Sequence, residues 1–144
     1  MISINDIACY REPDPMSRDG LIRAHAARPQ NAAITMLAFK TDDPSSCGIL
    51  ELDALGLVVG FHEKVQDPPG NLANGAVYIF EPEIFDFLRG LGKPVIDLST
   101  EVLPAYKKRI LAVTTRGYHR DIGNMTSLAH AELEFPQRPA ALQV

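Results

Sequence analysis

Apolar positions along the chain switch between the two-residue period of strands and the wider spacing of amphipathic helices. Short runs rich in Ile, Val and Phe predict strands at residues 1–6, 32–40, 48–53, 57–63, 74–81 and 110–115. Stretches with helical spacing predict helices at residues 17–28, 82–89, 100–108 and 124–134. The pattern therefore predicts strands that alternate with helices, with two adjacent strands at 48–63.

Capping residues support the first of these helices. Ser17 is suited to cap a helix that carries Leu21, Ile22 and His25 on one side, and Pro29 follows where that helix is expected to end. The strand at 32–40 then reads as a buried one because it is almost entirely apolar.

Turn residues mark the later boundaries. Gly56 tolerates the positive φ of a tight turn, which predicts a hairpin between the strands at 48–53 and 57–63. Pro82 stands at the favoured first position of a helix that Gly90 closes, and Asp97 or Ser99 is placed to cap the next one.

This order of elements predicts the fold class. Helices alternate with strands while one antiparallel hairpin interrupts them, which favours an α/β sandwich built on a mixed sheet. Ligands in such folds bind at the carboxyl ends of the strands. We expect one domain at residues 1–135 and a proline-containing tail at 136–144.

Composition narrows the possible partners. The chain has 144 residues, 46% of them apolar, which is enough for one compact domain. Charged residues make up 22% and the formal net charge is -4, so we expect no nucleic-acid partner. No window approaches the roughly 20 apolar residues that span a bilayer, so we expect no membrane partner either.

The two cysteines indicate a reducing compartment. Cys9 and Cys47 form no C-x-x-C pair and belong to no Cys/His cluster. The amino terminus lacks a basic segment followed by an apolar one. We therefore expect reduced thiols in a cytoplasmic protein.

The first candidate for chemistry is the pair Glu63 and Lys64, at the point where an apolar strand meets a loop. Strand neighbours point to opposite faces, so these two charges do not simply neutralise each other unless the strand bends. A carboxylate can accept two sugar hydroxyls, and an ammonium suits a phosphate. The alternative is a solvated ion pair at a strand end.

Glycines inside strand patterns form the second candidate. The dipeptide Asn74-Gly75 opens the clearest strand, and a glycine there often marks a bulge or the close approach of a ligand to the backbone. The alternative is an ordinary turn. Gly48, which opens another strand, favours the same interpretation less strongly.

Asp121 is the third candidate. It lies between an aromatic-rich stretch and a glycine that leads into the last helix. Its carboxylate can ligate a hard divalent cation, since Mg²⁺ takes one or two carboxylates together with substrate phosphates. It can equally cap the helix.

Two common hydrolytic mechanisms have no support. The four histidines show no H-x-x-x-H spacing, and no serine lies in a G-x-S-x-G motif. These patterns argue against zinc and serine hydrolases.

Taken in order, these stretches resemble the sugar-1-phosphate nucleotidyltransferases, which include mannose-1-phosphate guanylyltransferases and glucose-1-phosphate thymidylyltransferases. The resemblance extends from about residue 20 to residue 135 and implies a Rossmann-like α/β/α sandwich. It rests on five stretches: LIRAHAARPQNAAITML (21–37), GILELDALGLVVGFHEK (48–64), NGAVYIFEPEIFDFL (74–88), DLSTEVLP (97–104) and GYHRDIGN followed by TSL and HAE (117–132).

The resemblance implies a reaction in which the phosphate oxygen of a sugar 1-phosphate attacks the α-phosphorus of a nucleoside triphosphate. Glu63 would hold sugar hydroxyls and Lys64 the phosphate of the sugar 1-phosphate. Asn74 and Gly75 would line the sugar pocket with amide and backbone groups, and Gly48 would let the sugar lie against the chain.

The same resemblance implies Mg²⁺ as a cofactor. Asp121 would ligate the metal. A second metal aspartate usually closes a strand ending in Asn-Gly-Asp, and Asp6 is the residue placed to supply it, although the glycine is missing here. Lys64 and Asp121 would thus be the residues closest to the chemistry.

Three departures separate this sequence from the family pattern. Val65 replaces the usual proline after the Glu-Lys pair, and His119 stands where tryptophan is frequent. The glycine-rich G-x-G-x-R segment that holds the triphosphate should lie about a hundred residues upstream, and these 144 residues lack it. The chain therefore resembles the carboxyl-terminal, sugar-recognising half of such an enzyme.

Two functions follow from this resemblance. One is nucleotidyl transfer together with an amino-terminal half that binds the nucleoside triphosphate. The other is an inactive sugar-phosphate-binding or regulatory module. In either case the sheet should expose an edge, so we expect a homo-oligomer or a complex with a partner chain.

Overall fold

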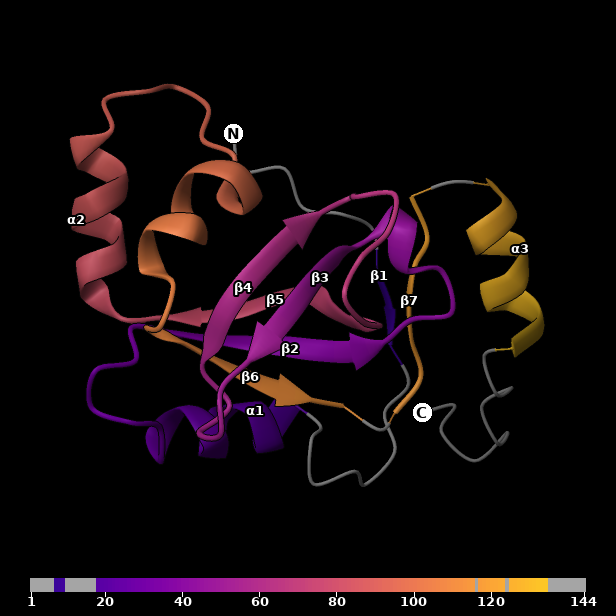
Figure 1. Cartoon of the computed structure of the whole chain (residues 1–144), viewed down its shortest axis with the longest axis horizontal. Helices are drawn as coiled ribbons and strands as arrows, with labels where there is room; N and C mark the ends of the chain where they lie inside the picture. Colours follow the sequence, from indigo (N-terminus) through magenta and orange to yellow (C-terminus); the bar gives the residue numbers. More distant parts are fainter. Residues whose placement is uncertain (1–6, 10–17, 116, 124, 135–144) are drawn as a thin grey trace, which may run out of the picture.

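The computed structural model describes residues 7–9, 18–115, 117–123 and 125–134, and Figure 1 shows their arrangement. The strands are β1 (Ile7–Cys9), β2 (Ile34–Lys40), β3 (Gly48–Leu52), β4 (Val58–Glu63), β5 (Leu72–Phe80), β6 (Ile110–Thr114) and β7 (His119–Asp121). The helices are α1 (Arg18–Ala26), α2 (Pro82–Gly90) and α3 (Met125–Glu134). The predicted strand at 1–6, the cap at Ser17 and the tail at 136–144 lie outside the described residues.

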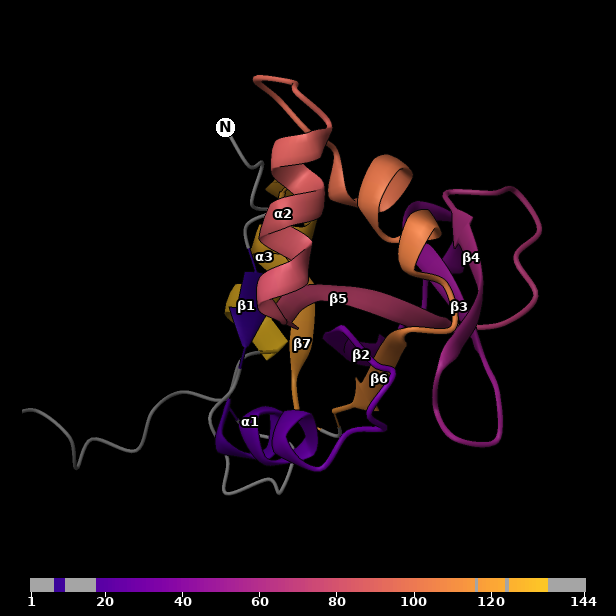
Figure 2. The same cartoon turned by 90° about the vertical axis from the view of Figure 1, so that its left-hand side faces the viewer.

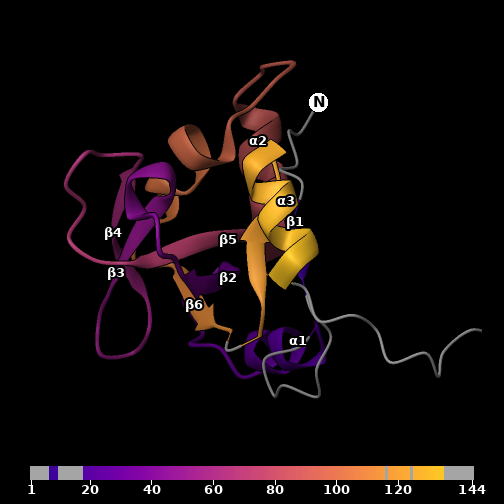
Figure 3. The same cartoon turned by 90° about the vertical axis from the view of Figure 1, so that its right-hand side faces the viewer.

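A five-stranded mixed sheet forms the centre of the fold. Its strand order is β4-β3-β5-β2-β6, with β2 and β6 parallel and the other neighbours antiparallel. β1 and β7 form a separate antiparallel pair. Figure 2 shows α2 and α1 on opposite sides of the central sheet, and Figure 3 shows α3 alongside β7. The predicted α/β class on a mixed sheet is confirmed.

β2 is buried on both faces, as its continuous apolar run predicts. Ile34, Met36 and Ala38 belong to the core cluster on the side of α2. Thr35 and Leu37 alternate with them and therefore face α1. β2 thus packs against the core on the side of α2 and against the core on the side of α1.

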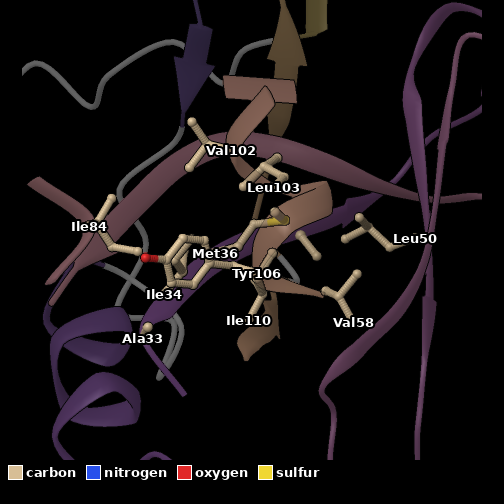
Figure 4. Close-up of a cluster of buried hydrophobic side chains, with 11 residues drawn as sticks. Ala33, Ile34, Met36, Leu50, Val58, Ile84, Val102, Leu103, Tyr106 and Ile110 are labelled. Atoms are coloured by element: carbon tan, nitrogen blue, oxygen red, sulfur yellow. The ribbon is translucent and has the colours of Figure 1, made fainter. Parts of the chain in front are cut away.

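The main core lies between the sheet and the segment that runs from α2 to β6, and Figure 4 shows it in close-up. That segment contains a single π-helical turn (Leu98–Val102) and a 3-10 turn (Pro104–Tyr106). The buried residues of the main core are Ala33, Ile34, Met36, Ala38, Leu50, Val58, Ile84, Val102, Leu103, Tyr106 and Ile110. Burial of this set holds α2 and both turns against the sheet.

One predicted helix is wrong in form. Residues 100–108 do not continue as a helix, because Pro104 has no N–H to donate and its ring disfavours the helical conformation of the preceding turn. The chain instead passes from the π turn into the 3-10 turn. Asp97 does cap this segment: its carboxylate accepts a hydrogen bond from the backbone N–H of Thr100 at 3.1 Å.

A polar cluster attaches α1 to the opposite side of the sheet. The ring of His25 lies 2.7 Å from the buried hydroxyl of Thr35 and 2.9 Å from the carboxylate of Glu81. Glu81 also forms an ion pair with Arg28 at 2.5 Å. Ile22 does not join Leu21 and His25 on the inner side as expected, since it is 51% exposed.

The predicted hairpin between β3 and β4 is confirmed. Gly56 has a φ of 78°, and both Leu55 and Leu57 donate backbone hydrogen bonds of 2.9 Å to the carboxylate of Asp53. The N–H of Ala112 in β6 donates to the carbonyl of Gly56 at 2.9 Å. The hairpin tip therefore reaches the outer side of β6.

Ile84 and Ile22 offer a matched test of this packing. Ile84 is fully buried in α2, whereas Ile22 is half exposed in α1. Ile84→Ala should lower the free energy of unfolding by about 2–5 kcal/mol, because it removes buried atoms and leaves a cavity. Ile22→Ala should change it by less than about 1 kcal/mol. Urea denaturation of both variants measures the contrast, and equal losses would contradict this packing.

Candidate functional site

A cavity of about 610 Å³ opens where β3, β4, β5 and β7 meet the π turn. Its position near the carboxyl ends of β2 and β4 agrees with the place expected for a ligand in this fold class. The lining residues are Phe39, Ser46, Cys47, Gly48, Glu63, Lys64, Asn74, Gly75, Ala76, Val77, Tyr78, Phe80, Val95, Ile96, Asp97, Leu98, Ser99, Thr100 and His119.

Five residues singled out in the sequence line this one cavity: Gly48, Glu63, Lys64, Asn74 and Gly75. They come from β3, from β5 and from the end of β4 with the residue that follows it, and the β4-β3-β5 order of the sheet brings them together. Their convergence is a property of the tertiary structure. The role of each residue in binding stays a prediction.

Glu63 and Lys64 reach the cavity because β4 ends between them. Glu63 is the last residue of β4 and pairs with Gly48 of β3. Lys64 has a φ of 49°, and its N–H donates to the carbonyl of Cys47 at 3.2 Å. This left-handed residue breaks the strand alternation. Both charged residues therefore lie on the cavity wall, Glu63 half-buried and Lys64 exposed.

β5 contains a bulge at the cavity. Met36 pairs with Tyr78 and Ala38 pairs with Asn74, so Leu37 alone stands opposite three residues of β5. Extra residues of this kind interrupt the hydrogen-bond ladder and re-aim the strand. The bulge interpretation of the Asn-Gly dipeptide is confirmed, and the turn interpretation is wrong.

The two glycines differ in what surrounds them. A Cβ on Gly75 would lie 2.9 Å from the backbone oxygen of Leu37 and 3.3 Å from the Nε2 of His119. A Cβ on Gly48 would meet only side-chain ends, the Oε2 of Glu63 and the Cζ of Phe61, both at 2.8 Å. Fixed backbone therefore requires glycine at position 75, whereas the side chains that a Cβ would meet at position 48 can move.

Asn74 is tied to Tyr78 within the same strand. Its Nδ2 lies 2.7 Å from the phenol oxygen of Tyr78, and the phenol donates to its Oδ1 at 3.0 Å. The same Oδ1 accepts the backbone N–H of Ala76 at 3.0 Å. Burial in the cavity wall raises the pKa of Tyr78 to about 12, with a smaller opposite effect from the hydrogen bond to Asn74.

The charges of the cavity wall are few. Among its described lining residues, Lys64 is the only lysine or arginine, and Glu63 and Asp97 are the carboxylates. The carboxylate of Asp97 caps the π turn through the N–H of Thr100. Glu63 and Lys64 are therefore the charged pair best placed to meet a ligand.

Several lining residues were not chosen from the sequence as site residues. Tyr78 and Phe39 fit an ordinary strand pattern, and His119 is a departure from the family pattern. The rings of Phe39 and His119 are 4.5 Å apart and form part of the wall. The polar phenol in the otherwise apolar run VYIF is the one local signal that could have identified Tyr78.

The part of the chain that the structure describes includes one of the two metal residues expected from the sequence. Asp6 lies outside the described residues. Asp121 ends β7, where its backbone pairs with Ile7, and it lies four positions before Met125, the first residue of α3. Within the described residues no group of three His, Cys, Asp or Glu could hold a metal ion.

Comparison with known proteins gives consistent matches. The nucleotidyl transferase family model matches residues 14–138. A glucose-1-phosphate adenylyltransferase from Bacillus cytotoxicus is 26% identical over 140 residues, covering 90% of this chain and 36% of its own length. A glucose-1-phosphate thymidylyltransferase from Streptomyces antibioticus is 32% identical over 115 residues, covering 76% and 32% respectively.

Solved structures show the same fold. A Bacillus anthracis protein described as a glucose-1-phosphate thymidylyltransferase, in complex with sucrose, has a TM-score of 0.71 at 19% identity. HddC from Yersinia pseudotuberculosis has a TM-score of 0.66 at 20% identity. Each match covers 90% of this chain and 51% or 52% of the other. The chain thus spans about a third of these curated relatives and about half of these structures.

The helices within the described ranges show no candidate for a bilayer span, since none of them combines the necessary length with sufficient apolar character.

Gly75→Ala and Gly48→Ala form a paired test of the cavity wall. Gly75→Ala should lower the free energy of unfolding by about 1–3 kcal/mol, because its new methyl group meets the backbone of Leu37. Gly48→Ala should have a smaller effect, since the ends of Glu63 and Phe61 can move. Urea unfolding measures both, and a larger loss at position 48 would contradict this geometry.

The raised pKa of Tyr78 predicts a pH dependence of stability. Its folded pKa of about 12 exceeds the reference value of 10.0, so its contribution is fully present below pH 10 and is lost as the pH rises through about 12. The difference in unfolding free energy between wild type and Tyr78→Phe should therefore be constant at neutral pH and shrink above pH 10. Urea titrations at several pH values measure it, and parallel profiles for the two proteins would refute it.

Proposed function

The chain belongs to the nucleotidyl transferase family, and we propose that its cavity binds a sugar 1-phosphate, the acceptor of a nucleotidyl group from a nucleoside triphosphate. The products would be a nucleotide-sugar and pyrophosphate. The names of two relatives, both glucose-1-phosphate nucleotidyltransferases, support this class of acceptor.

One observation supports the proposal above the others: residues chosen from the sequence for sugar-phosphate binding line a single cavity. Its volume of about 610 Å³ lies within the range of roughly 300–1,000 Å³ that is usual for small-molecule sites. If these residues were unrelated surface positions, Glu63, Lys64 and Gly75 would not be expected to line the same cavity.

The residues have complementary roles in this proposal. The carboxylate of Glu63 accepts hydrogen bonds from two sugar hydroxyls, and the ammonium of Lys64 pairs with the phosphate. The sugar ring lies against the backbone at Gly48, which lines the same cavity. Asn74 and Gly75 contribute the wall formed by the bulge of β5.

The chemistry requires positioning more than proton transfer. A phosphate oxygen of the sugar 1-phosphate forms a bond to the α-phosphorus, while the bond from that phosphorus to the pyrophosphate oxygen breaks. The nucleophile is already an anion, so no general base is needed. Lys64 neutralises part of its charge and holds it in line for attack.

Mg²⁺ belongs to the proposal as the cofactor that neutralises phosphate charge when bound. Asp121 of β7 is the residue through which this chain would contribute to its binding, and Asp6 is a second. One or two carboxylates suffice, since substrate phosphates usually supply further ligands.

The nucleoside triphosphate would be bound by a part of the enzyme beyond the region matched here. The chain spans about half of the related structures, and its 144 residues contain no G-x-G-x-R segment. We propose that this part is contributed by the same polypeptide or by a partner chain.

The same partial coverage favours a second candidate, a sugar-phosphate-binding or regulatory module without activity. Pyrophosphate release distinguishes the two functions. Wild-type protein with glucose 1-phosphate, Mg²⁺ and either ATP or dTTP should release pyrophosphate if the 144 residues suffice for catalysis. Binding of glucose 1-phosphate without release means that these 144 residues alone act as a binding module, and release after the nucleotide-binding part is added would select nucleotidyl transfer.

Lys64→Ala tests the proposed cavity. It should weaken the binding of glucose 1-phosphate by about 1.5–3 kcal/mol, because a charge-assisted contact to the phosphate is lost. Isothermal titration calorimetry measures the affinity. Lys40→Ala is the matched control, since Lys40 is an exposed lysine at the end of β2 that does not line the cavity.

Thermal unfolding should show little change for either lysine variant, since both side chains are exposed. Equal affinities of wild type and Lys64→Ala would remove Lys64 from the site. A wild-type protein that does not bind glucose 1-phosphate would reject the proposed acceptor.

A further inference from the structure

Three of the four hydrogen-bonding positions of the Asn74 side-chain amide are used within its own strand. An asparagine offers two acceptor lone pairs and two N–H donors. Both acceptor positions of Oδ1 are used, one by the N–H of Ala76 and one by the phenol of Tyr78, each at 3.0 Å. Nδ2 lies 2.7 Å from the same phenol oxygen. The amide is therefore directed along β5 and holds its two partners in a fixed arrangement.

Those hydrogen bonds span the bulge. Ala76 has a φ of 54°, which is uncommon for a residue with a Cβ and persists only where its surroundings enforce it. The bond from its N–H to Asn74 is such a constraint. Three consecutive residues of the bulge, at positions 75–77, line the cavity. Only Leu37 stands opposite them, so their ladder with β2 is interrupted.

We infer that Asn74 and Tyr78 are positioning residues, which hold the β5 bulge in place so that its backbone N–H and carbonyl groups meet the sugar hydroxyls. The inference rests on the proposed function for the identity of the ligand. It changes the role of Asn74 from a direct ligand-binding amide to a clamp on the backbone that binds.

Tyr78 is itself well fixed for this role. Its ring stacks on Phe80 with centroids 5.6 Å apart and an interplanar angle of 9°. A phenol with the ordinary pKa of about 10 is already protonated at neutral pH, and burial raises the pKa of Tyr78 further, to about 12. It therefore remains a donor to Asn74 throughout the physiological range.

Substitutions at position 74 separate the clamp from a direct contact. Asn74→Asp keeps an oxygen acceptor for the N–H of Ala76 and for the phenol of Tyr78, but it loses the amide donor. Asn74→Ala loses both. If the clamp is correct, Asn74→Asp preserves the protection of the Ala76 amide and Asn74→Ala does not. Tyr78→Phe removes only the phenol oxygen.

Backbone amide exchange, followed by NMR on the ligand-free protein, measures directly whether the hydrogen bonds of Asn74 hold the bulge in place. Protection factors at positions 75–77 should fall by about 2–12-fold in Tyr78→Phe and at least as much in Asn74→Ala, as expected for the loss of one neutral hydrogen bond. Tyr118→Phe is the matched control, because the Tyr118 phenol bonds to Glu134 and lies outside the cavity lining. It should leave those amides unchanged.

Calorimetry with glucose 1-phosphate then connects the clamp to binding. The dissociation constant should rise by about 2–12-fold in Tyr78→Phe and stay at the wild-type value in Tyr118→Phe. Bound glucose 1-phosphate should also slow exchange at positions 75–77 of the wild type. Unchanged protection in Tyr78→Phe and Asn74→Ala would overturn the inference, as would loss of protection in Asn74→Asp.

Failure of the inference differs from failure of the proposed function. If wild type binds glucose 1-phosphate and Lys64→Ala binds it more weakly, while Tyr78→Phe binds like wild type, the positioning role is wrong and the proposed acceptor stands. If wild type does not bind glucose 1-phosphate, the proposed acceptor is wrong and the positioning of a sugar-binding backbone falls with it. Amide exchange then still shows whether the clamp holds the bulge.

Discussion

The close approach of β5 to the backbone of Leu37 is the constraint on which the rest of the site depends. A Cβ at position 75 would lie 2.9 Å from the oxygen of Leu37, so the two strands can adopt this spacing only with glycine there. Leu37 is buried and cannot yield easily, because its strand is packed on both faces. β5 therefore changes its course instead of β2, and it forms the bulge that lines the cavity. Strand pairing resumes at Tyr78, which brings the phenol to the same wall as the charged end of β4.

Two of the residues on that wall have unusual backbone conformations. Lys64 and Ala76 are non-glycine residues with positive φ, at 49° and 54°, and both line the cavity. Each is held by a specific hydrogen bond, Lys64 through the carbonyl of Cys47 and Ala76 through the side chain of Asn74. Uncommon backbone conformations of this kind often occur at functional sites, where the surrounding structure enforces them. The sheet behind the cavity supplies that support, since the strands on both sides of these residues are paired within it.

Local sequence signals predicted most elements of the fold because they act over a few residues. The Gly56 turn, the helix that starts at Pro82 and the capping by Asp97 all depend on neighbours in the chain. The same reasoning failed where a local rule competes with packing. The segment at 100–108 has helical spacing of apolar residues, yet Pro104 divides it into two short turns. Ile22 looked like a core residue of an amphipathic helix, but α1 meets the sheet mainly through Leu21 and the His25 cluster.

The sequence by itself determined the α/β class, the family resemblance and the candidate residues, because residue types and spacing carry that information directly. The family model and the solved structures confirm the first two. Only the tertiary structure decided that Gly48, Glu63, Lys64, Asn74 and Gly75 share one cavity, since strand order and bulge geometry bring them together. The tertiary structure also decided which groups form hydrogen bonds with the side-chain amide of Asn74. Its hydrogen bonds join residues only two and four positions apart, but they form where the pairing of β5 with β2 is interrupted, and that pairing depends on strands distant in the sequence.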